Sequence, residues 1–599
     1  MKKNTLLISL FLSAGLYCSG QKLSVENIYA FESLNKNSYL GNVEYNQKDK
    51  TTRLYYVAKD MTKTVFTTYV FDDQLNFMEE QRDEYSIIDA SIEAINSVRA
   101  KYDWFNYRGE EYTQEAIWVL PTWKGEIVAR RVLYTYKYSW AIGNYYRTFK
   151  MMEKQTISGI DGGRLYLYDR IDNSLDGSVL LLVGLKADPG DKENKWQETR
   201  KFQFIKITND FKAIPGDMIE FEFNMGISFT KVLSQNAVII ETEGGEGEGN
   251  MMSYMEKSAG DLADGDAVLI FTPVKSMMIK KGMNPDPGAH TMIILNADGK
   301  IQSRIDYETP TSGWVVEGYA IAPGGNDVYY FGPAKDESYV NYLMPVNTPF
   351  GSSEVVADIK WKNFQVMKVS GDKVVYLNST PLADFKAKAV NPPSQRQSPD
   401  YVGKNFEKSL AYVTPGGELI ISGQKYTTTQ VPDPNSNVQG ATMTVKDEYT
   451  DLVMFHFDDQ GVLKAQYGIR RDKNNKYSKA NLTPQDVYIN SNGTLLYWIY
   501  GEIQGMRKGF EIATSIAGFQ GSIGVSKKKL LYYPAVSRID LANASVGDFV
   551  PLGTDAEGKQ LYYTNPEFPQ LLSEDQTTLT FVGEDKPGNL IWLGRMALE

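Results

Sequence analysis

The chemistry open to this chain is limited first by its histidines, since its 599 residues include only two, His290 and His456. General-base catalysis near neutral pH and most transition-metal sites depend on this side chain. His456 stands between Phe455 and Phe457, so we expect an ordinary side chain on one face of a strand. Neither histidine has a partner at zinc-motif spacing, and the one cysteine, Cys18, lies near the N-terminus. The sequence therefore predicts no zinc or iron–sulfur ligand.

Carboxylates are the remaining catalytic option, because a pair of Asp or Glu side chains can cleave a glycosidic bond. The chain has 74 acidic residues, and the sequence does not single out a pair. Asp261, Asp264 and Asp266 could ligate calcium, but they lack the ligand series and final glutamate of an EF-hand, so a polar loop is the simpler interpretation. A Gly-x-Ser-x-Gly elbow, a phosphate-binding loop and a dinucleotide fingerprint are missing. We therefore predict no catalytic residue and no cofactor.

Methionines gather in one stretch of the chain. The candidate contact residues there are Met251, Met252, Met255, Met277 and Met278. Two of them, Met252 and Met255, could bind Cu(I) through their thioethers, with His290 as a helper. Thioether side chains also suit contact with a protein partner or packing within the fold, and internal packing is the simplest of the three interpretations.

Aromatic side chains are dense between residues 102 and 146. Trp104 and Tyr107 are predicted to contribute to a binding surface, because such rings stack on sugars and anchor protein interfaces. Tyr134, Tyr136 and Tyr138 alternate along the chain and so share one face of a strand. Aromatic strand faces commonly pack against a neighbouring sheet, and this is the default expectation for the three tyrosines.

The elements that must position these residues are β-hairpins. Residues Ala411–Gly423 comprise an apolar run, a Pro-Gly-Gly turn, a second apolar run and a closing glycine. The pattern returns at Tyr319–Gly332, again with Pro-Gly-Gly, and at Val487–Gly501 with Asn-Gly. Glycine reaches positive φ without steric cost, so each copy predicts a tight chain reversal. A hairpin that recurs indicates a repeat architecture.

Short apolar runs separated by Gly, Pro, Asn and Asp continue from Tyr39 to the C-terminus, which is typical of an all-β chain. Eight runs match the second strand of the hairpin: Leu54–Val57, Ile117–Leu120, Val179–Val183, Val238–Glu241, Val328–Phe331, Leu419–Ser422, Leu495–Trp498 and Leu579–Val582. Further strands follow most of them, so each unit is predicted to be a meander of about four strands. The last unit is one strand short, and Ser24–Phe31 is a spare strand that we expect to complete it.

This organisation resembles the β-propeller superfamily across residues 21–599. The resemblance rests on repeat spacing and hairpin chemistry, since neither Trp-Asp repeat endings nor a consistent kelch Gly-Gly pattern is present. It implies one closed propeller of about eight four-stranded blades, or seven if the second or fourth marker run belongs to a neighbouring blade. Residues Glu243–His290 are predicted to be an insertion within the fourth repeat, and Ile87–Val98 a short amphipathic helix.

Residues 1–20 are predicted to be a secretory signal peptide. Two lysines precede the eleven-residue apolar run Leu6–Leu16, which is too short to span a bilayer as a helix, and small residues precede Gln21. Cleavage there predicts a periplasmic or outer-membrane-associated protein without disulfides. Lipidation of Cys18 is the less favoured alternative, because Tyr17 stands where a small residue normally precedes the lipidated cysteine.

Charge narrows the choice of partner. The chain has 63 basic and 74 acidic residues, a formal net charge of −11 and no basic run, which argues against binding nucleic acid or an anionic membrane surface. We predict a non-catalytic scaffold that binds a protein partner in a cell-envelope complex through residues 243–290 and the loops at one end of the propeller. The alternative is a propeller that binds or cleaves glycans with an Asp/Glu pair.

Overall fold

The structure is a computed structural model of the full chain. It describes residues 22–599 except 33, 35–37, 47, 60–62, 87–111, 123–125, 140–143, 186–199, 224, 234–259, 274–285, 287, 297, 312, 336–360, 433–442, 472–473, 509–527 and 565–569. The predicted signal peptide, the predicted helix at 87–98, and the candidate contact residues Met251, Met252, Met255, Met277, Met278, Trp104 and Tyr107 lie outside the described residues.

The described residues form antiparallel sheets whose strands mostly follow one another in chain order. The first four sheets contain β2 (Ser38–Asn46), β3 (Thr51–Lys59), β4 (Lys63–Phe71) and β5 (Phe77–Ser86); β6 (Tyr112–Pro121), β7 (Ile127–Ser139) and β8 (Asn144–Ile157); β9 (Leu165–Asn173), β10 (Ser178–Leu185), β11 (Lys201–Ile207) and β12 (Ala213–Glu220); and β13 (Met225–Val232), β14 (Ala267–Pro273), β15 (Ala289–Leu295) and β16 (Ile301–Glu308).

Two further sheets contain β17 (Gly318–Ile321), β18 (Asp327–Ala334), β19 (Asn363–Ser370) and β20 (Lys373–Pro381); and β22 (Phe406–Val413), β23 (Leu419–Pro432), β24 (Met443–Phe457), β25 (Leu463–Ile469) and the short parallel strand β21 (Ala389–Val390). The last sheet contains β26 (Gln485–Ile489), β27 (Leu495–Lys508), β28 (Lys528–Asp540), β29 (Ser545–Val546), β30 (Val550–Pro551), β31 (Tyr562–Thr564), β32 (Gln570–Leu572), β33 (Thr578–Asp585), β34 (Leu590–Ala597) and β1 (Val25–Ala30). The helices are η2 (Ile160–Gly162), α4 (Leu382–Ala387) and α5 (Lys476–Lys479).

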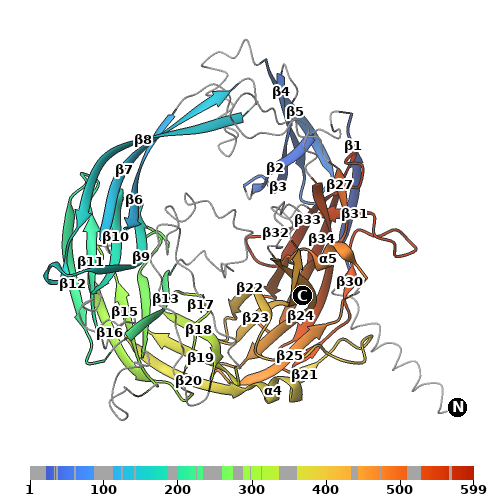
Figure 1. The fold of residues 1–599 in the computed structure, drawn as a ribbon. Helices are drawn as coiled ribbons and strands as arrows, with labels where there is room; N and C mark the ends of the chain where they lie inside the picture. Colours follow the sequence, from blue (N-terminus) through green and yellow to red (C-terminus); the bar gives the residue numbers. More distant parts are fainter. Residues whose placement is uncertain are drawn as a thin grey trace.

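Figure 1 shows these sheets following one another around a ring. From the second sheet to the last, and from the last to the first, neighbouring sheets pack face to face through apolar side chains that alternate along the strands. Phe202 of β11 meets Phe271 of β14 with ring centroids 4.9 Å apart, and both belong to one buried cluster shared by their two sheets. Phe364 of β19 meets Phe455 of β24 in the same way, at 5.7 Å. Four-stranded meanders packed radially in this manner form a β-propeller.

The predicted hairpins are present. The first copy is the β22–β23 corner, where Gly417 N donates to Thr414 O at 2.9 Å and Gly417 has a φ of +83°. The second is the β17–β18 corner, with Gly325 N donating to Ala322 O, and the third is the β26–β27 corner. The Pro-Gly-Gly and Asn-Gly signals therefore mark the connection between the first two strands of a unit.

The two ends of the chain meet in the last sheet. β1 pairs antiparallel with β34, from Val25 opposite Arg595 to Ala30 opposite Leu590, as the spare-strand prediction requires. The indole N–H of Trp592 donates to Glu26 Oε1 at 2.7 Å. The same strand reaches the first sheet, since Tyr29 OH donates to Leu75 O at 2.7 Å. β1 thus joins the last sheet to the first.

The fourth sheet differs from the prediction. Its second strand is β14, Ala267–Pro273, and not the run Val238–Glu241, which lies outside the described residues. β14 and the start of β15 fall inside the range 243–290 that was predicted to be an insertion, so these parts of the range belong to the repeat itself. Val238–Glu241 and Ala267–Pro273 are both short apolar runs, so composition alone could not tell which of them is the second strand of this sheet.

None of the helices in the described part of the chain has the length and hydrophobicity needed to span a bilayer.

Candidate ligand-binding site

The site with the most developed chemistry is a pocket between the sheet of β22–β25 and the sheet that begins with β26. It is an open hollow of about 570 Å³. The lining side chains come from the loop after β25, from α5 and from β27: Arg470, Arg471, Asn474, Asn475, Lys476, Tyr477, Tyr500, Glu502 and Gln504. Sequence analysis did not single out any of these residues, because they are charged and amide side chains in a loop without a motif.

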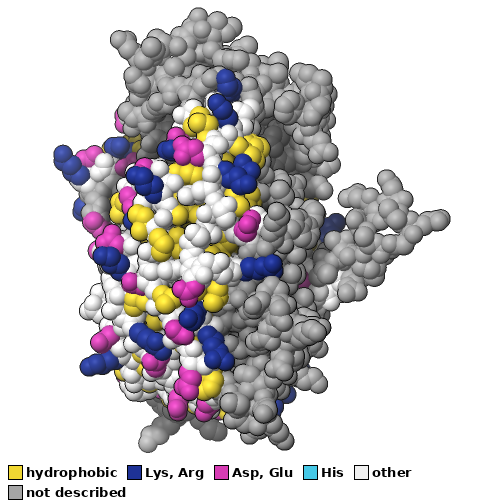
Figure 2. Space-filling view, turned by 60° about the vertical axis from the view of Figure 1, so that its left-hand side comes forward, with side chains coloured by type: hydrophobic (Ala, Val, Ile, Leu, Met, Phe, Trp, Pro, Cys, Tyr) yellow, Lys and Arg dark blue, Asp and Glu magenta, His cyan; other side chains and the backbone are white. Residues whose placement is uncertain are grey.

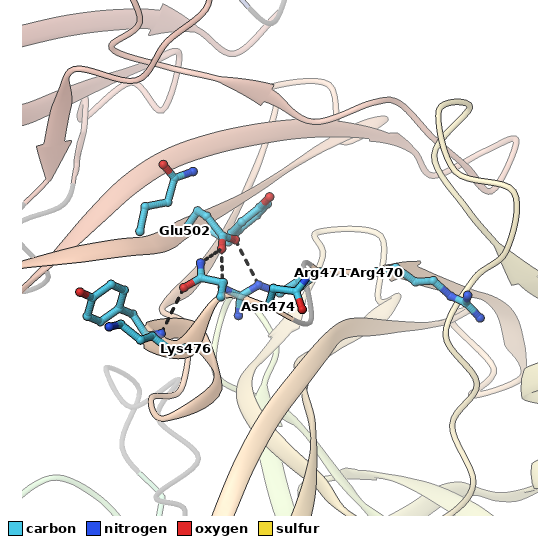
Figure 3. Close-up of a pocket in the computed structure, with 9 residues that line it drawn as sticks. Arg470, Arg471, Asn474, Lys476 and Glu502 are labelled. Atoms are coloured by element: carbon cyan, nitrogen blue, oxygen red, sulfur yellow. Dashed lines mark hydrogen bonds and ion pairs between the residues drawn. The ribbon is translucent and has the colours of Figure 1, made fainter.

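An ion pair joins two of the lining side chains, Arg471 and Glu502 (Figure 3). Arg471 donates from Nη2 to Glu502 Oε1 at 2.9 Å and from Nε to Glu502 Oε2 at 3.1 Å, a bidentate geometry that fixes both side chains. The Arg471 side chain is only 4% exposed. Its Nη1 also donates to Thr483 Oγ1, and its backbone N–H donates to Asp451 Oδ1. The Arg471 guanidinium is therefore committed to the protein itself.

Asn475 fixes the helix beside this ion pair. Its Oδ1 accepts from Tyr477 N at 3.1 Å and Ser478 N at 3.3 Å, which caps the first turn of α5. Its Nδ2 donates to Glu502 Oε1 at 3.1 Å and to Ile503 O at 2.7 Å. One amide thus caps α5, adds a third hydrogen bond to the Glu502 carboxylate and covers a carbonyl of β27.

Cationic side chains are frequent in the described part of the lining, although the whole chain is acidic. Arg470, Arg471 and Lys476 belong to it with the carboxylate of Glu502, while residues 472–473 of the same loop lie outside the described residues. Figure 3 shows the side chain of Arg470 pointing away from Glu502, Asn474 and Lys476. Lys476 Nζ lies 5.1 Å from the centroid of the Tyr477 ring, within range of a cation–π contact. Burial, with a smaller contribution from Glu502, raises the pKa of Tyr500, which keeps its hydroxyl protonated.

Both histidines are buried structural side chains. His290 in β15 hydrogen-bonds through Nδ1 to Gly288 O at 2.8 Å and stacks on Tyr307. His456 in β24 contacts Tyr467 OH through Nδ1 at 3.0 Å, and its Nε2 lies 3.3 Å from Glu418 Oε2 without hydrogen-bond geometry. Burial lowers the pKa of each to about 4, so both are neutral at pH 7.

The three aspartates weighed as calcium ligands lie in the turn before β14. Asp261 Oδ1 accepts from the backbone N–H groups of Ser174 and Ala263, each at 2.9 Å. Burial alone would raise the pKa of Asp261, but these hydrogen bonds outweigh it and lower the pKa. Burial raises the pKa of Asp266. Across the described ranges, no three His, Cys, Asp or Glu side chains are placed to hold a metal ion.

One buried carboxylate bears on the glycosidase alternative. Asp486 lies in β26, the first strand of its unit, and burial raises its pKa. Its Oδ2 accepts from Gln570 Nε2 at 2.5 Å, and the same amide donates to Tyr488 OH at 2.9 Å. Gln570 belongs to β32, so these side chains link two strands of the last sheet. Among the described residues, the polar contacts of Asp486 are therefore those of a link between strands, not of a carboxylate pair.

The described residues include some of the aromatic and methionine side chains that could form a surface. Tyr134 is buried and accepts a hydrogen bond from Trp118 Nε1 at 2.7 Å, as expected for a packed sheet face. On the outer strands, the structure adds exposed hydrophobic side chains that sequence analysis did not single out: Met78, Phe149, Met151, Met152, Ile214 and Met218. Figure 2 shows hydrophobic side chains among charged ones on the side that carries β8 and β12.

Comparisons with known proteins give similarity of low degree. No protein-family model matches the chain, and no curated protein matches it. Among solved structures, a variant of the Synechocystis apocarotenoid oxygenase is 12% identical, with 97% of this chain and 95% of that chain covered and a TM-score of 0.23. A GH43 β-1,3-galactosidase is 9% identical, covering 82% and 89%, with a TM-score of 0.23. A Dyadobacter fermentans protein of unknown function is 8% identical, covering 72% and 99%, with a TM-score of 0.21. Values this low assign neither a family nor an activity.

Proposed function

We propose that this chain is a non-catalytic, exported β-propeller that acts as an interaction scaffold in a cell-envelope complex. The observation that supports a binding role best is the pocket between the two sheets. Among the described lining residues the carboxylate is that of Glu502, which accepts three hydrogen bonds from Arg471 and Asn475, so most of its lone pairs already have donors within the protein. A carboxylate held in this way shapes a binding surface and is poorly placed to accept a proton from a substrate.

We further infer that the ring has eight units. The meanders β2–β5, β6–β8, β9–β12, β13–β16, β17–β20 and β22–β25 account for six. The ten-stranded sheet supplies two more, β26–β28 and the group β32, β33, β34 and β1, which β31 joins by pairing with both β28 and β33. A count of seven would treat this sheet as one unit. In the eight-unit arrangement, β1 completes the last meander.

Envelope pull-down tests the scaffold role. The full-length protein, carrying a C-terminal tag, would be expressed from its own signal and purified from gently solubilised envelopes. We expect envelope proteins to co-purify at fixed ratios, and a tagged exported protein of similar charge serves as the control. Recovery of the chain alone would contradict the proposal. Fractionation of the same cells tests export, since retention in the cytoplasm with residues 1–20 uncleaved would contradict it.

Glycan cleavage is the second candidate function, and the observation that favours it is the raised pKa of Asp486, since a general acid must hold its proton. We expect no hydrolysis of envelope polysaccharides by the purified protein. If hydrolysis is found and Asp486→Asn abolishes it while the protein stays folded, the chain is an enzyme and the non-catalytic proposal is wrong.

A further inference from the structure

We propose that the outer edge of β8 binds an extended strand of a protein partner, in which apolar and acidic side chains alternate. The inference rests on the proposed scaffold role and names the surface through which that role would act.

The first step concerns the length of β8. This strand has 14 residues, whereas the outer strands β5, β12, β16 and β20 have between 8 and 10. Two contacts tie its sheet to the end of the next one. Arg131 donates to Asn209 O in the turn between β11 and β12, and Gln155 donates to Phe211 O in the same turn. β8 continues past this turn (Figure 1), and residues 148–154 on it are all exposed.

The second step concerns backbone hydrogen bonds. Among the described strands, β8 pairs with β7 alone. Every second residue of an edge strand directs its N–H and C=O away from its one neighbour, and a second strand is the ligand that matches this row of donors and acceptors. Two other outer strands are protected against such pairing. β12 contains Pro215, which has no N–H, and β25 is covered on its outer side by β21, whereas β8 contains no proline.

The third step concerns the side chains beside this edge. Phe149 stands opposite Tyr134 of β7 and Met151 stands opposite Val132, so Phe149 and Met151 share one face of the sheet. They are 43% and 46% exposed. Lys150 lies between them and therefore projects from the other face. An added strand would place apolar side chains beside Phe149 and Met151, and the side chains beside Lys150 would alternate with them.

The fourth step chooses the partner by charge. Lys150 and Lys154 are exposed and have no ion pair within the described part of the chain, whereas Glu153 lies 3.7 Å from Arg131. Carboxylates on an added strand would complement both lysines. A second copy of β8 would instead bring two more lysines to the same edge, so like charges oppose self-pairing. The observations thus favour an acidic strand of another protein.

Binding of a defined peptide tests the inference. The probe is a labelled peptide of about ten residues, the length of an ordinary strand, in which valine alternates with glutamate. Fluorescence anisotropy with the purified mature protein should show saturable binding, which weakens as salt is added. Amide hydrogen exchange should slow at residues 148–154 when the peptide is bound, which places it on β8.

Substitutions on the outer strands test the position of the site. Met151→Glu should weaken binding by about fivefold, the size of one cross-strand pair at its upper limit. Met218→Glu is the matched control, because Met218 is 51% exposed but lies on β12, and it should bind as the wild type does. Lys150→Glu leaves the apolar face unchanged and should weaken binding to a similar degree. Thermal midpoints close to that of the wild type would confirm that the variants are folded.

Four outcomes would overturn the inference. These are absence of binding by the valine–glutamate peptide, equal binding of a version with proline at its centre, equal binding of a valine–lysine peptide, and a dimer in sedimentation that Met151→Glu dissociates, which would assign the edge to a second copy of the chain. The envelope pull-down separates these failures from failure of the scaffold role. Envelope partners retained by both the wild type and Met151→Glu, without peptide binding, contradict only the β8 surface, whereas peptide binding by a chain recovered alone contradicts only the scaffold role.

Discussion

Buried glutamine side chains tie loops to the strands of this propeller. Gln466 in β25 accepts from Tyr401 N at 3.2 Å and donates to Pro399 O at 2.6 Å. Gln365 in β19 makes the same pair of contacts with the N–H and C=O of Thr311, each at 3.2 Å. Both side chains are fully buried. A primary amide can satisfy a backbone donor and acceptor together, so it replaces the missing strand partner of a loop.

A third buried glutamine, Gln424, connects the β22–β25 sheet to the pocket. Gln424 in β23 accepts from the backbone N–H of Thr483 at 2.9 Å, and the Thr483 hydroxyl in turn accepts from Arg471. The position of the Arg471–Glu502 pair therefore depends on a buried glutamine in the neighbouring sheet. Sequence analysis had no means of finding these glutamines, because most glutamines are exposed and nothing local distinguishes a buried one.

The buried His456 predicts how stability depends on pH. The unfolded chain should protonate His456 near its ordinary pKa of about 6.5, whereas the folded chain resists protonation down to about 4. The unfolded state therefore binds more protons between these values, and stability falls as the pH is lowered through this window. Between pH 7.5 and pH 5, one such histidine should cost about 2 kcal/mol of unfolding free energy.

Urea unfolding followed by tryptophan fluorescence at pH 7.5 and pH 5 measures this effect. His456→Gln removes the titrating group, so the variant should lose about 2 kcal/mol less than the wild type over the same interval, whatever its stability at pH 7.5. The comparison of slopes isolates the histidine from Asp486, whose raised pKa acts in the opposite direction. Identical slopes in the two proteins would show that His456 has the same pKa in the folded and unfolded states, and would contradict this prediction.

At the scale of elements, the closing glycine of the recurrent hairpin has a steric cause. A Cβ placed on Gly423 would lie 2.2 Å from Glu407 O on the paired strand β22, and one on Gly332 would lie 1.9 Å from Val315 O. In both units, the chain segment before or within the first strand approaches the second strand too closely for a side chain. In these two copies, the closing glycine is thus required by contact between neighbouring backbone segments, whereas the nearest atom to a Cβ on Gly501 of the third copy is Tyr532 Cβ at 3.1 Å.

Gly423→Ala should consequently destabilise the protein by several kcal/mol, about 3 or more, because backbone atoms must move to admit the methyl group. Gly416→Ala in the same hairpin is the matched control, since the nearest atom to its added Cβ is Thr414 Oγ1 at 3.7 Å. We expect the control to change the thermal midpoint little. Equal midpoints for the two variants, measured by circular dichroism, would contradict this account of the closing glycine.

Local signals explain how far the sequence could predict the fold. Turn glycines act within a few residues, so the corners at Gly325, Gly417 and Gly493 were predictable. The second strand of the fourth sheet was not, because its position depends on which apolar run pairs with β13 and β15. The pocket could not be predicted from the sequence either. Arg471 and Glu502 are 31 residues apart and meet only because two sheets pack against each other.

At the scale of the whole molecule, strand β1 holds the N-terminal and C-terminal parts of the chain together. β1 pairs with β34 along six residues, and Ser24 N extends the contact by donating to Arg595 O at 2.7 Å. On its other side, Asn27 Nδ2 donates to Leu75 O at 3.0 Å in the turn between β4 and β5. Arg595 also reaches that turn, through Asp73. Contacts between the first and last sheets thus pass through β1 and β34, and also through β33, where Glu584 Oε1 accepts from Tyr56 OH at 3.2 Å.

Removal of residues 21–31 should therefore weaken the molecule as a whole and not only its N-terminus. Val25, Tyr29 and Phe31 pack into the cluster shared by the first and last sheets, so their loss should cost about 3 kcal/mol or more. It would also expose the edge of β34 to pairing with other molecules. We expect a lower thermal midpoint and concentration-dependent self-association in sedimentation velocity, both reversed when a peptide of residues 22–32 is added.

In the full-length chain, Tyr29→Ala should reproduce part of the loss, whereas Ile28→Ala should have little effect because Ile28 is 49% exposed on the opposite face of the strand. A truncated chain that stays monomeric with an unchanged midpoint would show that the ring does not depend on this strand.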